Sequence, residues 1–258
     1  MREPRLVLVT GAAGAIGSAL TLAIAARYGA AHLALADVDD AGLARVAAQL
    51  PGRTSSWRWD LTDPEALAGR WAELVAAQGE VDVLVNCAGI MHMRSLAGTP
   101  WPLGKRILDI DLISPLRLMS LATPGMIERG TGAVINVSSM AGRVPLRGAS
   151  YYGGAKAGIA MASEIAHLEL APAGVHVVTV YPGPVASALE RGARAQLRPS
   201  LMARVMPVGD AATVAGAVMR ALERREPRVI YPALYALADR ALGVATWVSR
   251  RFSPMPEA

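Results

Sequence analysis

Two side chains near the middle of the chain, Tyr152 and Lys156, have the types and the spacing of a proton-transfer pair. On a helix, residues four positions apart lie on one face. A free phenol has a pKa of about 10, and acid or base work near neutrality requires a pKa lower by roughly 3, or about 4 kcal/mol. An ammonium at ~4 Å and an effective dielectric of ~20 supplies about 4 kcal/mol. The pair therefore indicates acid–base catalysis, and a packing tyrosine beside a surface lysine is the alternative.

Two serines, Ser138 and Ser139, precede this pair and follow the apolar run 133–137. That run predicts a buried strand, which places both hydroxyls at its carboxyl end. Open α/β sheets bind their ligands at this end. We therefore expect a strand end and a helix start to converge on one site.

A glycine loop lies between the first predicted strand and the first predicted helix. Glycines let a backbone turn tightly against a pyrophosphate, and a following helix presents its free N–H groups to the anion. Asp37, twenty residues after Gly17, ends the second predicted strand, where a carboxylate accepts hydrogen bonds from ribose hydroxyls. The loop and the carboxylate together predict dinucleotide binding, although Asp37 would also suit a helix cap or turn. The expected loop contacts are Gly11, Gly14, Ala15, Ile16 and Gly17.

Asp37 also bears on the choice of dinucleotide. A 2′-phosphate beside this carboxylate would meet like-charge repulsion, and the segments 12–16 and 38–40 contain no lysine or arginine to offset it. We therefore expect NAD rather than NADP.

Strand-length apolar runs alternate with helical patterns along the whole chain, which predicts one α/β domain over 1–258. The expected architecture is a Rossmann-like, doubly wound parallel sheet of about seven strands with helices on both faces. The predicted strands are 6–9, 32–36, 54–59, 81–85, 133–137, 175–180 and 229–231, and the predicted helices are 16–27, 41–50, 64–78, 104–129, 152–170 and 210–224.

Composition narrows the possible partners. A length of 258 residues with 53% hydrophobic side chains supports a large core. The net charge of +5 comes from scattered arginines without an aromatic–basic cluster, so no nucleic-acid partner is expected. The four histidines lack metal-ligand spacing, and we expect no metal. A single cysteine, Cys87, and a start without a charged-then-apolar leader predict a cytoplasmic protein.

From Thr10 to about Ser187, the chain resembles the short-chain dehydrogenase/reductase family. The resemblance is carried by the glycine loop, Asp60-Leu61, Asn86-Cys87-Ala88-Gly89, Asn136-Val137-Ser138-Ser139, Tyr152 with Lys156, and Pro182-Gly183, all in the family's order. It implies an NAD-linked oxidoreductase that interconverts a secondary alcohol and a ketone. A homodimer or homotetramer is the expected assembly.

The resemblance also implies a role for individual residues. Ser139 would bond the substrate oxygen and Tyr152 would move its proton, while Lys156 would lower the phenol pKa and hold the nicotinamide ribose. Asp60 and Leu61 would contact adenine, and Asn86, Ala88 and Gly89 would line the middle of the cofactor. Pro182, Gly183, Val185 and Ser187 would shape the nicotinamide pocket. Without the family context, Asp60 could cap a turn and 86–89 could simply end a strand.

Two positions depart from the family pattern. Ala15 stands where compact members carry a glycine, and Gly14 recreates the spacing of longer members. Asp111 stands where the catalytic tetrad has asparagine. An ionised aspartate accepts but cannot donate, and it adds negative charge near Lys156. A dinucleotide-binding regulatory or scaffold protein with impaired catalysis is therefore the alternative function, against which the intact Ser139, Tyr152 and Lys156 argue.

Substrate contacts are expected in the loops 90–102 and 185–208, because these follow strand ends on the ligand side. Their apolar residues suit a hydrophobic lipid-, steroid- or terpenoid-like alcohol or ketone, although a lid packed on the core would show the same composition. These residues are Met91, Met93, Leu96, Trp101, Leu189, Leu197, Leu201, Met202, Val205 and Met206.

The C-terminal segment 232–252 has near-helical apolar spacing with arginines nearby, and we expect a helical tail. Such a tail packs on a sister subunit or closes a pocket more often than it touches a membrane surface.

Overall fold

The computed structural model describes residues 3–198 and 207–256. Its centre is a seven-stranded sheet of order β3-β2-β1-β4-β5-β6-β7, in which every neighbouring pair is parallel. The strands are β1 (Leu6–Thr10), β2 (His32–Asp37), β3 (Thr54–Arg58), β4 (Val83–Asn86), β5 (Gly132–Val137), β6 (Val175–Pro182) and β7 (Arg228–Tyr231). This confirms the predicted Rossmann-like α/β fold.

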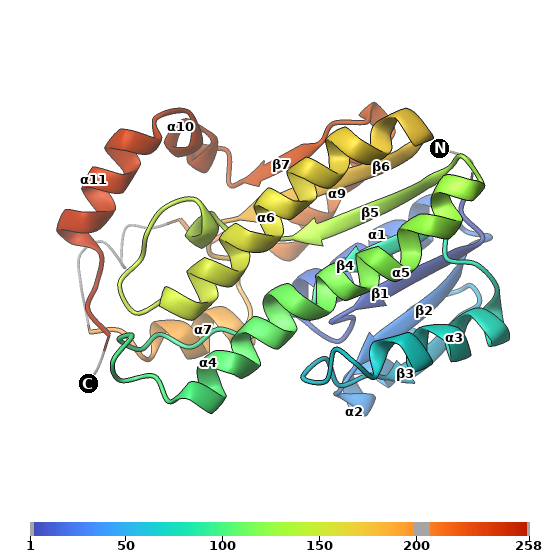
Figure 1. The fold of residues 1–258 in the computed structure, drawn as a ribbon, viewed down its shortest axis with the longest axis horizontal. Coiled ribbons are helices and arrows are strands. Elements are labelled where there is room, and N and C mark those ends of the chain that lie inside the picture. The colour runs from blue at the N-terminus through green and yellow to red at the C-terminus, as the bar shows by residue number, and fades with distance from the viewer. Residues whose placement is uncertain (1–2, 199–206, 257–258) are drawn as a thin grey trace.

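Helices cover both faces of the sheet, as expected from the alternating pattern (Figure 1). Side chains alternate along each strand, so Val7 and Val9 pack with α1 (Ala15–Arg27), α2 (Asp40–Ala47) and α9 (Ala211–Arg224). Leu6 and Leu8 pack on the other face with α3 (Leu67–Gln78), α5 (Ser114–Glu128) and α6 (Ser150–Leu170). The sheet therefore lies between two apolar layers.

The single helix expected over 104–129 is three segments in the structure. These are α4 (Trp101–Leu108), a π-helical turn (Asp109–Ile113) and α5. Pro115 explains the interruption, because a proline has no N–H for the carbonyl four residues earlier and its ring crowds that carbonyl. The carbonyl in question belongs to Asp111. The wider turn keeps Asp109, Ile110 and Asp111 buried.

Two further differences lie on the ligand side of the sheet. Inside the predicted loop 185–208, residues Ala188–Arg194 form helix α7, where the Ser187 hydroxyl accepts a hydrogen bond from the Glu190 N–H at 3.0 Å. The pattern Ser-x-x-Glu is a recognised helix start and would have revealed α7. The predicted tail is two helices, α10 (Leu234–Arg240) and α11 (Leu242–Phe252), separated at Ala241.

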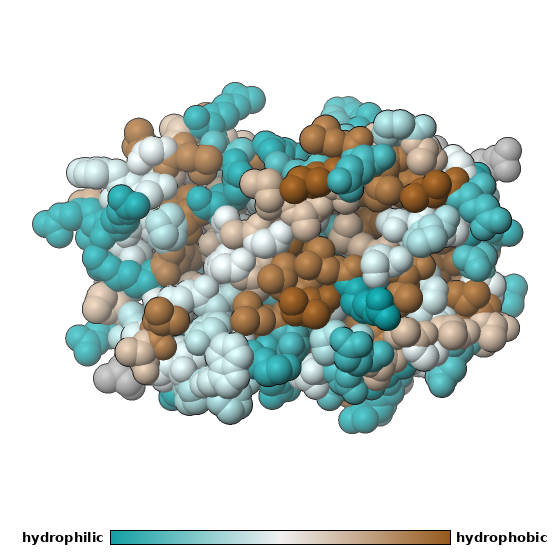
Figure 2. Space-filling model, viewed as in Figure 1, coloured by the Kyte–Doolittle hydropathy of each residue, from teal (hydrophilic) through white to brown (hydrophobic). Residues whose placement is uncertain are grey.

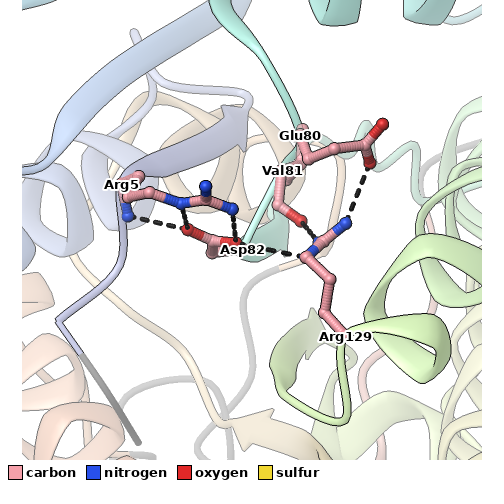
Figure 3. A network of polar contacts seen from close by, with 5 residues as sticks. All are labelled: Arg5, Glu80, Val81, Asp82 and Arg129. Carbon is pink, nitrogen blue, oxygen red and sulfur yellow. Dashed lines mark hydrogen bonds and ion pairs between the residues drawn. The ribbon is translucent and has the colours of Figure 1, made fainter.

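At the amino end of the sheet, charged residues join segments distant in sequence (Figure 3). The Asp82 carboxylate accepts from the Arg5 backbone N–H at 2.8 Å and from the Arg5 Nε at 3.2 Å. Arg129 lies 3.6 Å from Asp82, donates to the Val81 carbonyl at 2.8 Å and pairs with Glu80 at 3.0 Å. This network ties the starts of β1 and β4 to the end of α5.

Candidate active site

A cavity of about 1320 Å³ opens at the carboxyl ends of the strands. Its walls come from the segments after β1 to β6 and from α7, α10 and α11. The cavity includes Ser139, Tyr152 and Lys156 together with every predicted cofactor residue except Asn86. The structure thus brings together residues from almost the whole chain at one end of the sheet.

The glycine loop fits the backbone of β4 closely. Gly11 has φ +66°, and a Cβ there would lie 2.6 Å from the Cα of Ala88. Gly14 is the N-cap of α1 and has no side chain to bond the first-turn N–H groups, so these stay available to an anion. Gly17 faces the Gly11 carbonyl too closely for any side chain. Ala15 begins α1 and lines the cavity, so the loop accommodates its methyl group.

Asp37 is fixed by backbone donors at the cavity wall. Its carboxylate accepts from the N–H groups of Ala13 at 3.0 Å, Val38 at 2.7 Å and Asp39 at 3.1 Å. Arg58 on β3 is the register partner of Asp37 in the parallel sheet, which their distance in the sequence did not reveal. Arg58 pairs with Asp40 at 3.1 Å. Asp37 and Asp39 both line the cavity at the end of β2, whereas Asp40 does not.

Asp60 and Leu61, for which adenine contacts are expected, line the cavity after β3. The Asp60 carboxylate also accepts from the Thr62 N–H at 3.0 Å and the Thr62 hydroxyl at 2.8 Å. These hydrogen bonds hold the pKa of Asp60 below its usual range. The turn-capping interpretation of Asp60 is therefore correct, and it is compatible with a position at the cavity wall.

Asn86 does not lie where the sequence predicted. It is buried, and its amide donates to the Asn136 side-chain oxygen at 2.8 Å and the Pro115 carbonyl at 3.3 Å, away from the cavity. The backbone at Ala88 and Gly89 lines the cavity instead. Thr10 positions that backbone, because its hydroxyl accepts from the N–H groups of Cys87 at 3.2 Å and Ala88 at 3.4 Å.

The two serines after β5 have different environments. Ser138 is buried, and its hydroxyl donates to the Lys156 carbonyl at 2.6 Å. Ser139 is half-buried, and its hydroxyl accepts from the Ala141 N–H at 3.1 Å. The Ser139 hydroxyl therefore lies at the cavity wall, where it lowers the pKa of Tyr152, whereas the Ser138 hydroxyl is bonded to α6.

Lys156 lies at the centre of a buried polar cluster. Its ammonium donates to the Val137 carbonyl at 3.0 Å, lies 3.4 Å from Asp111 Oδ2, and is 5.8 Å from the centre of the Tyr152 ring. Asp111 Oδ1 accepts from the Ile90 N–H at 2.9 Å. A Cβ on Gly89 would lie 3.2 Å from both charged groups, so a glycine leaves room for this pair.

The pKa shift of Tyr152 in this cluster differs from the one expected from the sequence. Burial raises the pKa of Tyr152, and Asp111 adds to that effect while Lys156 and the Ser139 hydroxyl oppose it. Lys156 lowers the phenol pKa as expected, but its effect, which was expected to be nearly sufficient alone, is smaller than the effect of burial. Burial would lower the pKa of Lys156, but Asp111 and Tyr152 raise it, so the lysine stays charged. Burial also raises the pKa of Asp111.

The segment after β6 forms the wall opposite the glycine loop. Pro182, Gly183, Val185 and Ser187 all line the cavity, and Ser187 also caps α7. The Tyr235 ring packs on Gly183, where a Cβ would lie 2.6 Å from a ring carbon. The sequence analysis missed Tyr235, because nothing in the spacing of the tail indicates that α10 folds back onto β6.

Apolar side chains fill the rest of the cavity wall. Met91, Met93, Leu189 and Leu197 line it as predicted, whereas Leu96 and Trp101 lie outside it and are exposed. Leu201, Met202, Val205 and Met206 fall outside the described residues. Residues of the C-terminal tail complete the wall, although the sequence did not predict substrate contacts for them: Leu234, Leu237, Val244, Val248 and Phe252.

Residues 3–198 and 207–256 contain no group of three or more metal-ligating side chains close enough to hold an ion. Neither range contains a helix with the length and hydrophobicity needed to cross a membrane.

Comparisons with known proteins agree with this geometry. The short chain dehydrogenase family model matches residues 5–198. The cis-4-hydroxycyclohexanecarboxylate dehydrogenase of Sinomonas cyclohexanicum is 35% identical over 212 residues, which cover 80% of this chain and 82% of that protein. Some other relatives are much longer, and the aligned part of this chain spans 15% of one of them.

Solved structures show the same similarity. A short-chain dehydrogenase from Streptomyces avermitilis superposes with a TM-score of 0.80 at 27% identity and covers 96% of both chains. A short-chain dehydrogenase from Sphingobium yanoikuyae, solved in complex with NADPH, has a TM-score of 0.77 at 26% identity and covers 93% of this chain and 94% of its own.

Proposed function

The chain belongs to the short-chain dehydrogenase family of nicotinamide-dependent oxidoreductases, and from this premise we propose that it interconverts a hydrophobic secondary alcohol and its ketone. The observation that carries the proposal is the convergence of Ser139, Tyr152 and Lys156 on one cavity with the glycine loop. The relative that acts on cis-4-hydroxycyclohexanecarboxylate, a secondary alcohol on a ring, supports the same reaction class.

The cavity fits a nicotinamide dinucleotide along its length. The free N–H groups of α1 suit the pyrophosphate, Asp37 suits the adenosine ribose, and Asp60 and Leu61 suit adenine. Ala88 and Gly89 continue the wall, which ends at Pro182, Gly183, Val185 and Ser187. When bound, the nicotinamide ring exchanges a hydride with the substrate carbon.

The chain's own residues handle the proton. The Ser139 hydroxyl donates to the substrate oxygen, and the Tyr152 phenol gives that oxygen a proton in ketone reduction or takes one in alcohol oxidation. Lys156 supplies the positive charge that favours the phenolate. Asp111 holds Lys156 charged but opposes this effect on the phenol. Ketone reduction requires the protonated tyrosine, and alcohol oxidation requires the phenolate.

For the cofactor, NAD(H) is proposed over NADP(H). Asp37 is held in place by three backbone N–H groups, so it cannot easily turn away from a 2′-phosphate. Two arginines of this region are already paired, Arg58 with Asp40 at 3.1 Å and Arg45 with Asp39 at 3.3 Å. Fluorescence titration with NADH and NADPH tests the proposal, which fails if NADPH binds as tightly as NADH.

The assembly is proposed to be a homodimer or homotetramer. Exposed apolar residues gather on the face formed by α5 and α6 (Figure 2). They include Ile127, Met161, Ile165 and Leu168, the last of which is 74% exposed. An apolar face of this kind is typical of a subunit interface.

The decisive experiment measures nicotinamide absorbance with a panel of apolar alcohols and ketones, including cyclohexanols, and with both cofactors. Tyr152→Phe should lower kcat by about 10³-fold, because the proton donor is lost. Tyr151→Phe is the matched control: this neighbouring tyrosine packs against Trp101 at a ring separation of 6.5 Å and should retain wild-type rates. Tight NADH binding without turnover of any substrate would favour the regulatory or scaffold function instead.

A further inference from the structure

Helices α10 and α11 expose large apolar side chains at the mouth of the cavity. Five of these residues form what we call the tail patch: Leu234 (60% exposed), Leu237 (60%), Val244 (64%), Trp247 (64%) and Phe252 (52%). All of them except Trp247 also line the cavity. The outer surface of the tail is therefore continuous with the inner wall of the site.

The charges around the tail patch have one sign. Arg240, Arg250 and Arg251 are all exposed. Between Pro232 and Pro256 the sequence contains a single acidic residue, Asp239, which is bonded to Arg143 at 2.7 Å. The Arg251 guanidinium lies 5.7 Å from the centre of the Phe252 ring. The tail therefore combines aromatic and aliphatic groups with cations, the composition of a surface that binds anionic lipids.

The other exposed apolar face has a different charge pattern. On α5 and α6, the apolar residues are accompanied by exposed carboxylates, including Glu128 and Glu169. If two tail patches met across a twofold axis, their arginines would face one another without acidic partners. Charge therefore favours an anionic lipid over a second copy of this chain as the occupant of the tail patch.

The tail is held firmly enough to orient the whole molecule on a surface. Arg143 links α10 to the segment after Ser139 through Asp239. Arg147 donates to the Arg250 carbonyl at 2.7 Å and to the Ser253 carbonyl at 3.1 Å. Figure 1 shows both tail helices beyond the carboxyl ends of the strands. The cavity lies at the same ends and is lined by residues of both helices. A surface that binds the tail would therefore face the cavity mouth.

We propose that the tail patch docks on an anionic lipid surface, so that a hydrophobic substrate enters the cavity directly from the bilayer. The docking stands independently of the reaction, whereas the route of the substrate rests on the proposed function. The bound orientation would place the apolar groups among acyl chains and the arginines among headgroups.

Co-sedimentation of the full chain with vesicles tests the docking. The probes are phosphatidylcholine vesicles with and without phosphatidylglycerol. Wild-type protein should bind the anionic vesicles, and added salt should weaken the binding. Trp247→Ser should reduce the apparent partition coefficient on the order of tenfold, because an exposed aromatic anchor is lost. Arg251→Glu should reduce it through charge alone.

The matched control is Leu168→Ser, which removes an apolar residue that is more exposed than Trp247 (74% against 64%) from the α5–α6 face and should leave vesicle binding unchanged. Circular dichroism verifies that each variant is folded. The proposal is overturned if wild-type protein binds neither vesicle, if Leu168→Ser weakens binding as much as Trp247→Ser, or if Trp247→Ser disrupts a dimer instead. Vesicle binding without turnover of any ketone would support the docking and contradict only the proposed reaction.

Discussion

Two clusters of charged side chains lie at opposite ends of the same parallel sheet. At the amino end, Arg5 and Asp82 have side chains that are 72% and 13% exposed. At the carboxyl end, Lys156 and Asp111 are 6% and 0% exposed. The Asp82 carboxylate accepts several hydrogen bonds from Arg5, whereas Asp111 Oδ2 has no hydrogen-bond partner within the described residues and lies 3.4 Å from the Lys156 ammonium. A desolvated ion pair therefore lies where chemistry is proposed, and a more exposed pair with more hydrogen bonds lies where it is not.

The largest test of this comparison removes one cation from each cluster. Lys156→Met should lower kcat by about 10²- to 10⁴-fold, because the charge that favours the phenolate is lost. It should also cost about 3 kcal/mol or more of unfolding free energy above neutral pH, since Asp111 is left buried and unpaired. At lower pH the cost should shrink, because Asp111 then takes up a proton.

Arg129→Met is the matched change at the amino end. Its pairs with Glu80 and Asp82 are partly exposed, so the loss should be about 1 kcal/mol. Steady-state rates and urea unfolding of both variants measure the contrast. An equal loss of activity in Arg129→Met would show that the two ends of the sheet are not functionally distinct.

A smaller effect is expected from Asp111→Asn. This change removes a negative charge that raises the pKa of Tyr152, so the phenolate should form at lower pH. Alcohol oxidation should therefore reach its half-maximal rate at lower pH, and turnover at neutral pH should stay unchanged or rise by up to about tenfold. The pH profile of kcat for oxidation measures the shift.

Asp109→Asn is the control for that experiment. Asp109 lies in the same π-helical turn but pairs with Lys105 at 2.6 Å, outside the cluster, and its substitution should leave the profile unmoved. A collapse of activity in Asp111→Asn would mean that the carboxylate itself is required for the reaction.

Local patterns were enough to predict the sheet, the glycine loop and the convergence of Ser139, Tyr152 and Lys156. They succeed because strand alternation and helix periodicity act over a few residues. The misplaced Asn86 and the unforeseen Tyr235 depend on contacts between segments 50 or more residues apart. The pKa of Tyr152 was misjudged for a related reason, since a sequence shows which charges are present and not how deeply they are buried.

The two clusters also differ in how far solvent and salt screen their charges. Asp82→Asn tests this difference and has the smallest expected effect. Burial would raise the pKa of Asp82, but hydrogen bonds and charge from Arg5 lower it overall. A carboxyl whose folded pKa is lowered stabilises the fold above its unfolded pKa of about 3.9, and this contribution is lost as pH falls through the folded value. The variant should therefore be about 1 kcal/mol less stable than wild type at pH 7, and the gap should close below about pH 4. Urea unfolding at several pH values measures the gap. Half-molar salt should narrow it at pH 7, because the Arg5–Asp82 pair is exposed, while the same salt leaves the pH profile of the buried Lys156–Asp111 pair in place. If the stability gap changed with neither salt nor pH, Asp82 would act through packing. The difference in solvent exposure between the two clusters would then no longer explain why only the carboxyl end of the sheet suits catalysis.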